Sequence, residues 1–299
     1  MITLSKNVRK YWQLYVFIVP ALAYFIIFHY IPIYGAQIAF KNYSAVKGIW
    51  GSTWIGFDHF ERFFNSYYFK LLLTNTLQIN LYQLALFPVS IIVALSIHEV
   101  TRARFKRFVQ LVTYAPHFIS VVVISGMILV FLDPSSGIVN TIIKALGGEP
   151  ISFITEPGWF KSIYVLSGEW QNLGWGAIIY LAALAGINPE LHEAAQIDGA
   201  SRWQRIFHIN VPGIMPTIII LFILNLGSFM NVGFEKIYLL QNPLNMESSE
   251  VIQTHVYKSG LLQAQYSYTA AIGLFNNAIN FAILLIFNRL ARRSGNSLW

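Results

Sequence analysis

The sequence has no cysteine and very little charge. Among its 299 residues, charged side chains make up 11% and hydrophobic ones 56%, whereas a soluble domain carries roughly 25% charged residues. The absence of cysteine excludes disulfides, thiolate chemistry and cysteine-ligated metals. The shortage of charge excludes a water-soluble fold for most of the chain, so its main solvent must be lipid.

Two further absences concern energy. The sequence has no Gly-Lys dipeptide, which excludes the G-x-x-x-x-G-K-[ST] loop that holds nucleotide phosphates. Its long apolar runs contain no Asp, Lys or Arg, and a single Glu, Glu169, near the start of one run. Ion-coupled transporters usually place several ionisable groups inside the membrane. We therefore expect a chain that is not an enzyme and has no cofactor of its own, and whose energy, if it transports, comes from elsewhere.

Metal and nucleic-acid sites are not expected. His192-Glu193-Ala194-Ala195-Gln196 approaches the zinc-binding H-E-x-x-H pattern, but Gln196 stands where the second histidine must ligate. The net charge of +7 comes from basic residues at the ends of apolar runs and not from one patch. That distribution is typical of membrane orientation.

What the sequence does have is long apolar runs. About 20 apolar residues of helix cross a bilayer core of roughly 30 Å, and six runs reach that length. They predict an all-α membrane protein of a single domain, residues 1–299, with a core bundle at 71–290 and an additional first span and external aromatic cap at 1–70. A short external helix is also expected at 137–146. The six predicted spans are about 12–34, 71–97, 108–132, 166–187, 211–233 and 267–288.

Loop charge predicts the orientation of these spans. Twelve of the 20 Lys and Arg residues fall on one side of the predicted membrane. By the positive-inside rule that side is cytoplasmic, which places both termini and residues 193–216 in the cytoplasm of a multi-pass plasma-membrane protein. The twelve are Lys6, Arg9, Lys10, Arg102, Arg104, Lys106, Arg107, Arg202, Arg205, Arg289, Arg292 and Arg293.

The polar stretch EAAQIDGASRWQRIFHINVPGIMP at 193–216 predicts two short helices joined by a glycine. Asn188-Pro189 suits a helix start, Gly199 suits a helix end, and Ser201 with Gln204 forms a capping box for a second helix. On physical grounds the stretch is either an amphipathic connector at the membrane surface or a docking element for a soluble partner.

The same residues resemble a known motif. Glu193-Ala194-Ala195, three residues, Gly199, nine residues and Ile209-Asn210-Val211-Pro212 resemble the EAA motif of permease subunits in binding-protein-dependent ABC importers, with Val211 where leucine is usual. The stretches at 11–43 and 233–243 are similar to permeases for oligosaccharides derived from plant or algal polysaccharides.

This resemblance implies a bacterial type I importer permease of six spans. Residues 189–212, the EAA loop, would form a coupling helix between spans four and five, docked on a separate ATPase that binds ATP and Mg. It further implies two ATPase subunits, an external solute-binding protein, a second permease and an oligosaccharide substrate that crosses by alternating access. The implied ATPase-docking residues are Glu193, Ala194, Ala195, Asp198, Gly199, Ala200, Arg202 and Pro212.

Polar residues at helical spacing within the spans are candidates for the sugar pathway. The alternative is that these side chains join membrane helices by interhelical hydrogen bonds, or that the tryptophan anchors the membrane interface. The candidates are Asn75, Gln78, Tyr82, Trp170, Gln171, Asn172, Asn225 and Phe229, with Asn276 and Asn280 in the last span.

Other functions stay open at this stage. An ion-coupled secondary sugar transporter or channel is one alternative, and a membrane enzyme or scaffold is another. The second permease is expected to be a different, homologous chain, although a homodimer remains an alternative. The sequence does not give the length, the linkage or the charge of the sugar.

Overall fold

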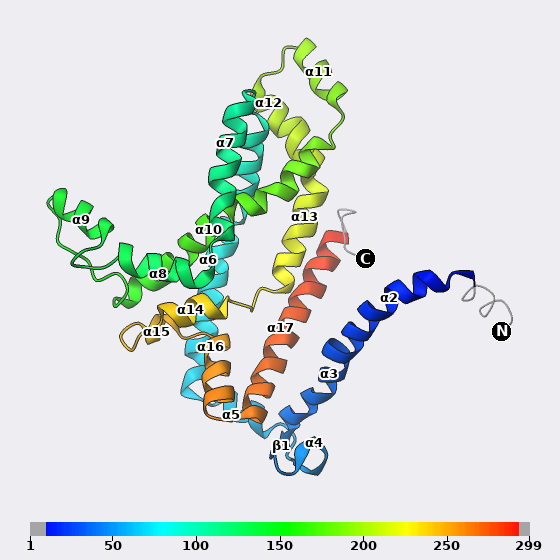
Figure 1. Ribbon diagram of the computed structural model, residues 1–299, viewed down its shortest axis with the longest axis vertical. Coiled ribbons are helices and arrows are strands. Elements are labelled where there is room, and N and C mark those ends of the chain that lie inside the picture. Colours follow the sequence, from blue (N-terminus) through cyan, green and yellow to red (C-terminus); the bar gives the residue numbers. More distant parts are fainter. Residues whose placement is uncertain (1–9, 293–299) are drawn as a thin grey trace. The chain divides into compact units, whose positions relative to one another are not determined.

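The computed structural model describes residues 10–292, so Lys6, Arg9 and Arg293 of the predicted cytoplasmic charge cluster lie outside the described residues. The chain divides into two compact units. The first unit combines residues 1–66 with 256–275, and the second combines 67–255 with 276–299. Helix α17 (Tyr266–Arg292) begins in the first unit and continues in the second (Figure 1).

The first unit opens with a long apolar helix. It comprises α2 (Trp12–Phe25), a π-helical turn (Ile26–Tyr30), α3 (Ile31–Gly35) and a 3-10 turn (Ala36–Phe40). Together they form a 29-residue candidate span, and none of its most apolar window is buried within the chain. A helix that is apolar on every side requires an apolar environment on every side. The predicted first span is confirmed as a helix long and apolar enough to cross.

The rest of the first unit is small and aromatic. Strands β1 (Lys41–Asn42) and β2 (Thr53–Trp54) pair antiparallel around α4 (Gly48–Gly51), and α5 (Asp58–Phe64) follows. Phe40 stacks on Trp54 with ring centroids 5.6 Å apart, and Phe63 meets Phe275 at 5.6 Å. A π-helical turn (Lys258–Leu262) leads into α17.

The second unit is built on two long helices, α6 (Tyr67–His98) and α10 (Pro157–Ala185), which pack along each other (Figure 1). Its other helices, in chain order, are α7 (Ala103–Tyr114), α8 (Val121–Phe131), α9 (Ile138–Ala145), α11 (Pro189–Ile197), α12 (Arg202–Arg205), α13 (Val211–Gly227), α14 (Phe234–Leu240) and α15 (Met246–Ser249). Helix α16 (Ile252–Tyr257) begins in the second unit and ends in the first. Its core includes a cluster around Ile79, Val165 and Ile237 and another around Ala94, Tyr180 and Ile214. The short helix predicted at 137–146 is confirmed as α9.

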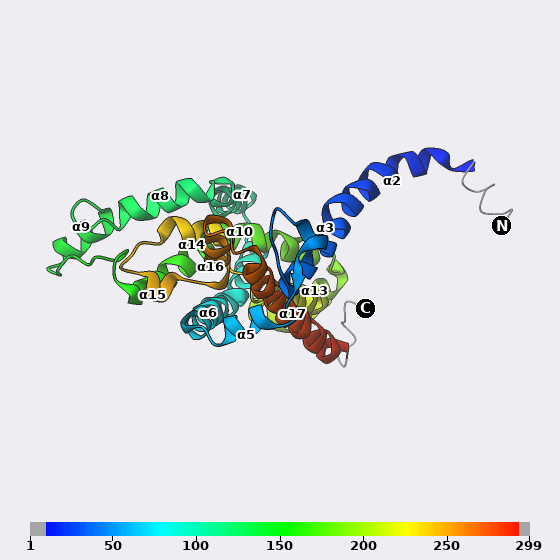
Figure 2. The ribbon, with the colours of Figure 1, turned by 90° about the horizontal axis from the view of Figure 1, so that it is seen from below.

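The predicted third span, 108–132, is not a continuous helix. Between α7 and α8 the chain bends by 100°, and Figure 2 shows α8 running away from α7. A 3-10 turn at Ala115–Phe118 ends the first helix, Ile119 is extended, and Ser120 starts the second by accepting a hydrogen bond from Val123 N at 3.3 Å. Hydropathy is continuous across this bend, so the apolar run alone does not reveal it.

Fewer than six helices meet the criteria of length and composition for a membrane span. Within residues 10–292 the helices that qualify are 12–40, 67–98, 202–227 and 266–292, or five if the bent pair counts as one. The predicted fourth span lies in α10, which begins earlier than expected, at Pro157, and carries Lys161 and Glu169. The predicted fifth span ends at Gly227, short of the expected residue 233. The all-helical membrane class is confirmed.

Candidate functional site

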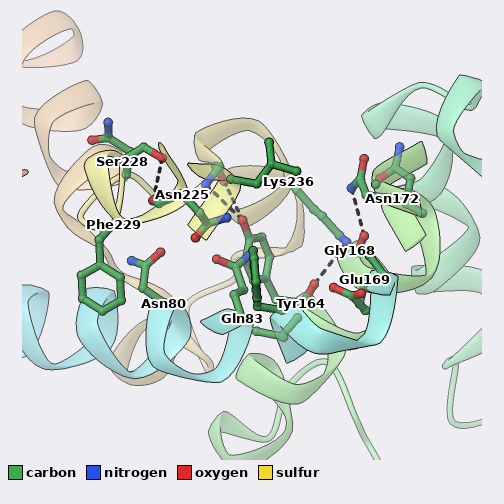
Figure 3. Close-up of a pocket in the computed structure, with 18 of the residues that line it drawn as sticks. Asn80, Gln83, Tyr164, Gly168, Glu169, Asn172, Asn225, Ser228, Phe229 and Lys236 are labelled. Carbon is green, nitrogen blue, oxygen red and sulfur yellow. Dashed lines mark hydrogen bonds between the residues drawn. The ribbon is translucent and has the colours of Figure 1, made fainter. Parts of the chain in front are cut away.

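A cavity of about 830 Å³ lies within the second unit, between α6, α10 and the segment from the end of α13 to α14. Figure 3 shows part of its lining, where the amides of Asn80 and Gln83 lie near the rings of Phe229 and Tyr164. Its polar and charged residues are Asn80, Gln83, Ser90, Tyr164, Glu169, Gln171, Asn172, Tyr180, Asn225, Ser228, Asn231, Glu235 and Lys236.

Helix α6 presents one face to this cavity. Asn80, Gln83, Phe87 and Ser90 recur every three or four residues, so they lie along one side of the helix. The sequence prediction chose the stripe of Asn75, Gln78 and Tyr82 on the same helix. Both stripes have helical spacing, and periodicity does not show which of them faces a cavity.

The predicted stripe on α6 lies elsewhere. Asn75 and Gln78 line a second cavity of about 650 Å³. The Asn75 amide donates to the carbonyl oxygens of Glu247 and Glu250 at 2.8 and 3.0 Å, and the Gln78 side chain accepts from Lys161. Tyr82 is half-buried against the core. The contacts of Asn75 are those of a residue that joins segments of the fold.

Four of the other predicted pathway residues line the main cavity: Gln171, Asn172, Asn225 and Phe229. Gln171 is buried and donates to the Ile119 carbonyl at 3.0 Å, which ties α10 to the bend between α7 and α8. Asn172 lies 3.1 Å from a ring nitrogen of His117. Trp170 is 49% exposed and does not belong to the lining.

The loop between α13 and α14 is held by side chains from two helices. Asn280 of α17 accepts from Met230 N at 2.7 Å, and Asn276 donates to the Asn231 side chain at 2.8 Å. Gly233 N donates to the Tyr164 hydroxyl of α10 at 3.1 Å. The two asparagines of α17 therefore join segments of the fold, which was the alternative to a pathway role.

Lys236 was not among the predicted pathway residues, yet among residues 10–292 it is the one basic residue of the cavity lining. Its side chain is 7% exposed and reaches from α14 to α10, where Nζ donates to the Tyr164 carbonyl at 3.2 Å (Figure 3). The ammonium lies beside Gly168 of α10, where a β-carbon would be 3.5 Å from Nζ, an ordinary van der Waals contact. Lys236 follows Glu235 and directly precedes the apolar run from Ile237 to Leu240. In the sequence it stands among the Lys and Arg residues that lie outside the twelve assigned to the cytoplasmic side.

The EAA loop is the second candidate site. Helix α11 begins at Pro189, where the Asn188 side chain accepts from Glu190 N at 3.1 Å, and Gly199 follows the helix with φ +78°. Ser201 and Gln204 form the capping box that starts α12. The predicted pair of helices with a glycine between them is confirmed.

The residues predicted to dock on an ATPase share one loop and are largely accessible. Ala195 and Ala200 are half-buried, and the others are exposed: Glu193, Ala194, Asp198, Gly199, Arg202 and Pro212. Four large apolar side chains are exposed on the same loop: Leu191 at 53%, Ile197 at 87%, Trp203 at 70% and Phe207 at 61%.

The base of the EAA loop is anchored to α6. Asn210 is fully buried at the end of a π-helical turn (Ile206–Asn210), and its amide nitrogen donates to Glu99 Oε1 at 3.2 Å. Glu99 directly follows α6, so this hydrogen bond joins the loop to a helix that lines the cavity. The Asn210 side-chain oxygen has no hydrogen-bond partner among the described residues.

Replacing Asn210 by alanine is expected to destabilise the assembled protein by about 1–3 kcal/mol, because it removes a buried hydrogen bond to a carboxylate. The thermal unfolding midpoint in detergent should fall. The exposed Asn65 supplies the control, because an alanine there removes no side-chain hydrogen bond. An unchanged midpoint for Asn210→Ala would show that the contact with Glu99 contributes no stability.

Within the described part of the chain, no group of three or more His, Cys, Asp or Glu side chains is placed to hold a metal ion.

Comparison with known proteins gives consistent matches. Residues 86–296 match the family described as "Binding-protein-dependent transport system inner membrane component". Protein LplB of Bacillus subtilis is 43% identical over 95% of this chain and 90% of its own length. The polygalacturonan/rhamnogalacturonan transport system permease protein YteP of the same organism is 43% identical over 96% and 89%. A chain of a bacterial ABC transporter involved in the import of the acidic polysaccharide alginate superposes with a TM-score of 0.91, at 41% identity over 97% of this chain and 99% of that one.

Proposed function

Because this chain belongs to the family of inner-membrane components of binding-protein-dependent transport systems and is therefore a permease subunit, we propose that it carries oligosaccharides derived from plant or algal polysaccharides. Two relatives support the substrate class, one named for polygalacturonan and rhamnogalacturonan and one for alginate. The observation that carries the proposal is the 830 Å³ cavity, whose amides, hydroxyls and aromatic rings suit sugar hydroxyls and sugar faces.

Six crossings are proposed for this permease. The four long apolar helices supply four, and the bent pair α7 and α8 supplies a fifth. Helix α10 supplies the sixth, because its 29 residues span about 43 Å at 1.5 Å per residue, more than a bilayer core. In chain order the EAA loop then lies between the fourth and fifth crossings. With basic residues inside, both termini and the EAA loop are cytoplasmic.

The energy for transport comes from a separate pair of ATPase subunits, to which the EAA loop docks. The exposed Ile197, Trp203 and Phe207 give the loop an apolar contact surface, and Glu193 and Asp198 give it negative charge. The hydrogen bond between Asn210 and Glu99 passes a movement of the docked loop to α6. A second permease completes the pathway, and an external binding protein delivers the sugar when the cavity opens outward.

Uptake into proteoliposomes tests this function. The complete importer, with its ATPases and its binding protein, should accumulate labelled oligosaccharide only when ATP is present on the ATPase side. An ionophore that dissipates ion gradients should not change the rate. Uptake that continues without ATP and collapses with the ionophore would instead support the alternative of an ion-coupled secondary transporter.

A further inference from the structure

Lys236 is a buried cation with unused hydrogen-bonding capacity. Its ammonium group has three donors, and one of them reaches the Tyr164 carbonyl. The ring of Tyr164 lies 5.3 Å from Nζ and adds a cation–π contact. Within residues 10–292, no carboxylate forms an ion pair with Lys236. Two of the three donors of the Lys236 ammonium, and most of its positive charge, therefore have no partner among the described residues.

Burial of such a group is costly. An ammonium removed from water loses several kcal/mol of hydration, which an opposite charge or several hydrogen bonds must offset. Lys236 belongs to the lining of the 830 Å³ cavity, so the space that its ammonium borders is the space that the transported molecule occupies. The missing partner can therefore come from the substrate.

The other charges of the cavity are arranged unevenly. Glu169 is half-buried on α10, and Glu235 is exposed on α14. Neither carboxylate is an ion-pair partner of Lys236. An anionic substrate is therefore attracted to the buried ammonium and repelled by the two carboxylates, whose oxygens accept hydrogen bonds from sugar hydroxyls. The lining therefore favours an anionic sugar only when its carboxylate turns towards Lys236 and away from Glu169 and Glu235.

Building on the proposed function, we infer that Lys236 is a specificity-determining residue that binds a sugar carboxylate, so that this permease prefers acidic oligosaccharides containing uronic acids. The carboxylate turns towards Lys236, and the hydroxyls turn towards Glu169. The cavity volume falls within the range of ordinary ligand pockets, about 300–1,000 Å³, which suits a few sugar rings at a time.

The test compares two substrates with one backbone: a short oligogalacturonate, which is anionic, and its methyl ester, which is neutral. Uptake is measured in proteoliposomes with the complete importer. Each variant is compared with the unsubstituted protein on the same substrate, so that the preference of the binding protein cancels. Lys236→Gln removes the charge, Lys236→Arg keeps it, and Lys144→Gln removes an exposed lysine outside both cavities as the control.

Lys236→Gln should lower uptake of the acid, at concentrations below saturation, by about 10-fold or more, because a hydrogen bond to a charged group contributes about 1.5–3 kcal/mol. Uptake of the ester should change by less than about 2-fold. Lys236→Arg should retain most uptake of the acid, and Lys144→Gln should retain all of it. An equal loss for both substrates, or no loss for either, would overturn the inference.

A pH profile provides a second readout that uses the acid alone. Burial lowers the pKa of Lys236 to about 8, whereas uronate carboxylates stay ionised at any pH well above 4. The attraction is therefore nearly complete at pH 7 and is lost as the pH rises through about 8. The titratable groups that face Lys236 are Tyr164 and Glu169 of α10 and Glu235 of its own helix, and α8, which packs on α14, has none.

Uptake of the acid should therefore fall between pH 7 and pH 9 in the unsubstituted protein more steeply than in Lys236→Arg, because a guanidinium keeps its charge. Parallel profiles would overturn the inference. The proposed function fails separately, if the unsubstituted importer takes up neither oligosaccharide with ATP.

Discussion

Replacing Gly199 by valine is expected to reduce ATP-driven uptake at least 10-fold while the protein still inserts into the membrane. Gly199 has φ +78°, a conformation that costs an ordinary residue roughly 1–2 kcal/mol and a β-branched residue more. A β-carbon at this position has no neighbour within 4 Å, so the strain comes from the backbone and not from crowding. The turn between α11 and α12 must then change, and with it the surface presented to the ATPase.

A series at this position separates strain from bulk. Gly199→Asn should retain much of the uptake, since asparagine tolerates the left-handed region better than other residues, whereas Gly199→Ala should be intermediate. Membrane content of each variant, measured by immunoblot, is the control. Docking through charge is tested by adding Glu193→Lys. Normal uptake by a Glu193→Lys, Gly199→Trp double variant would show that the EAA loop does not dock.

Gly174→Ala is expected to destabilise the permease by about 3 kcal/mol or more, at the upper end of overpacking effects. Gly174 packs against the C-terminal end of α7. A β-carbon there would lie 2.3 Å from the Thr113 carbonyl oxygen and 2.7 Å from Tyr114 Cδ1. A backbone oxygen cannot move aside as a flexible side chain does, so the two helices must separate. The yield of monodisperse complex and its thermal unfolding midpoint should both fall sharply.

The same helix supplies a matched control. Gly158 also lies in α10, and a β-carbon at that position meets nothing within 4 Å. Gly158→Ala should leave the unfolding midpoint unchanged or slightly higher, because alanine favours helix more than glycine does. If the two variants behave alike, close packing at Gly174 does not hold α10 against α7.

The two helices of the EAA loop were predictable because local signals specify them. Each signal involves only residues that are close by in the chain. The residues that carry these signals have the predicted geometry in the structure: Asn188, Pro189, Gly199 and Ser201. The 100° bend between α7 and α8 was not predictable in this way. The two helices together are long and apolar enough for one span, and a proline such as Pro116 also occurs in uninterrupted membrane helices.

Cavity residues were harder to predict than helices. Helical spacing places Asn75 and Gln78 on one side of α6, and Asn80 and Gln83 on another. Only the packing of α10 and α14 decides which side lines the main cavity. Lys236 illustrates the same limit. Its charge suggests a solvated loop, and its burial follows from contacts with Tyr164 and Gly168, which lie about 70 residues earlier in the chain.

The helix at residues 12–40 has a requirement that its own unit does not meet. None of its most apolar window is buried, so the apolar surroundings that it needs must come from lipid or from a helix that meets it in the membrane. Substitutions along this helix are therefore constrained by its hydrophobicity and by its length, which must match the thickness of the bilayer core.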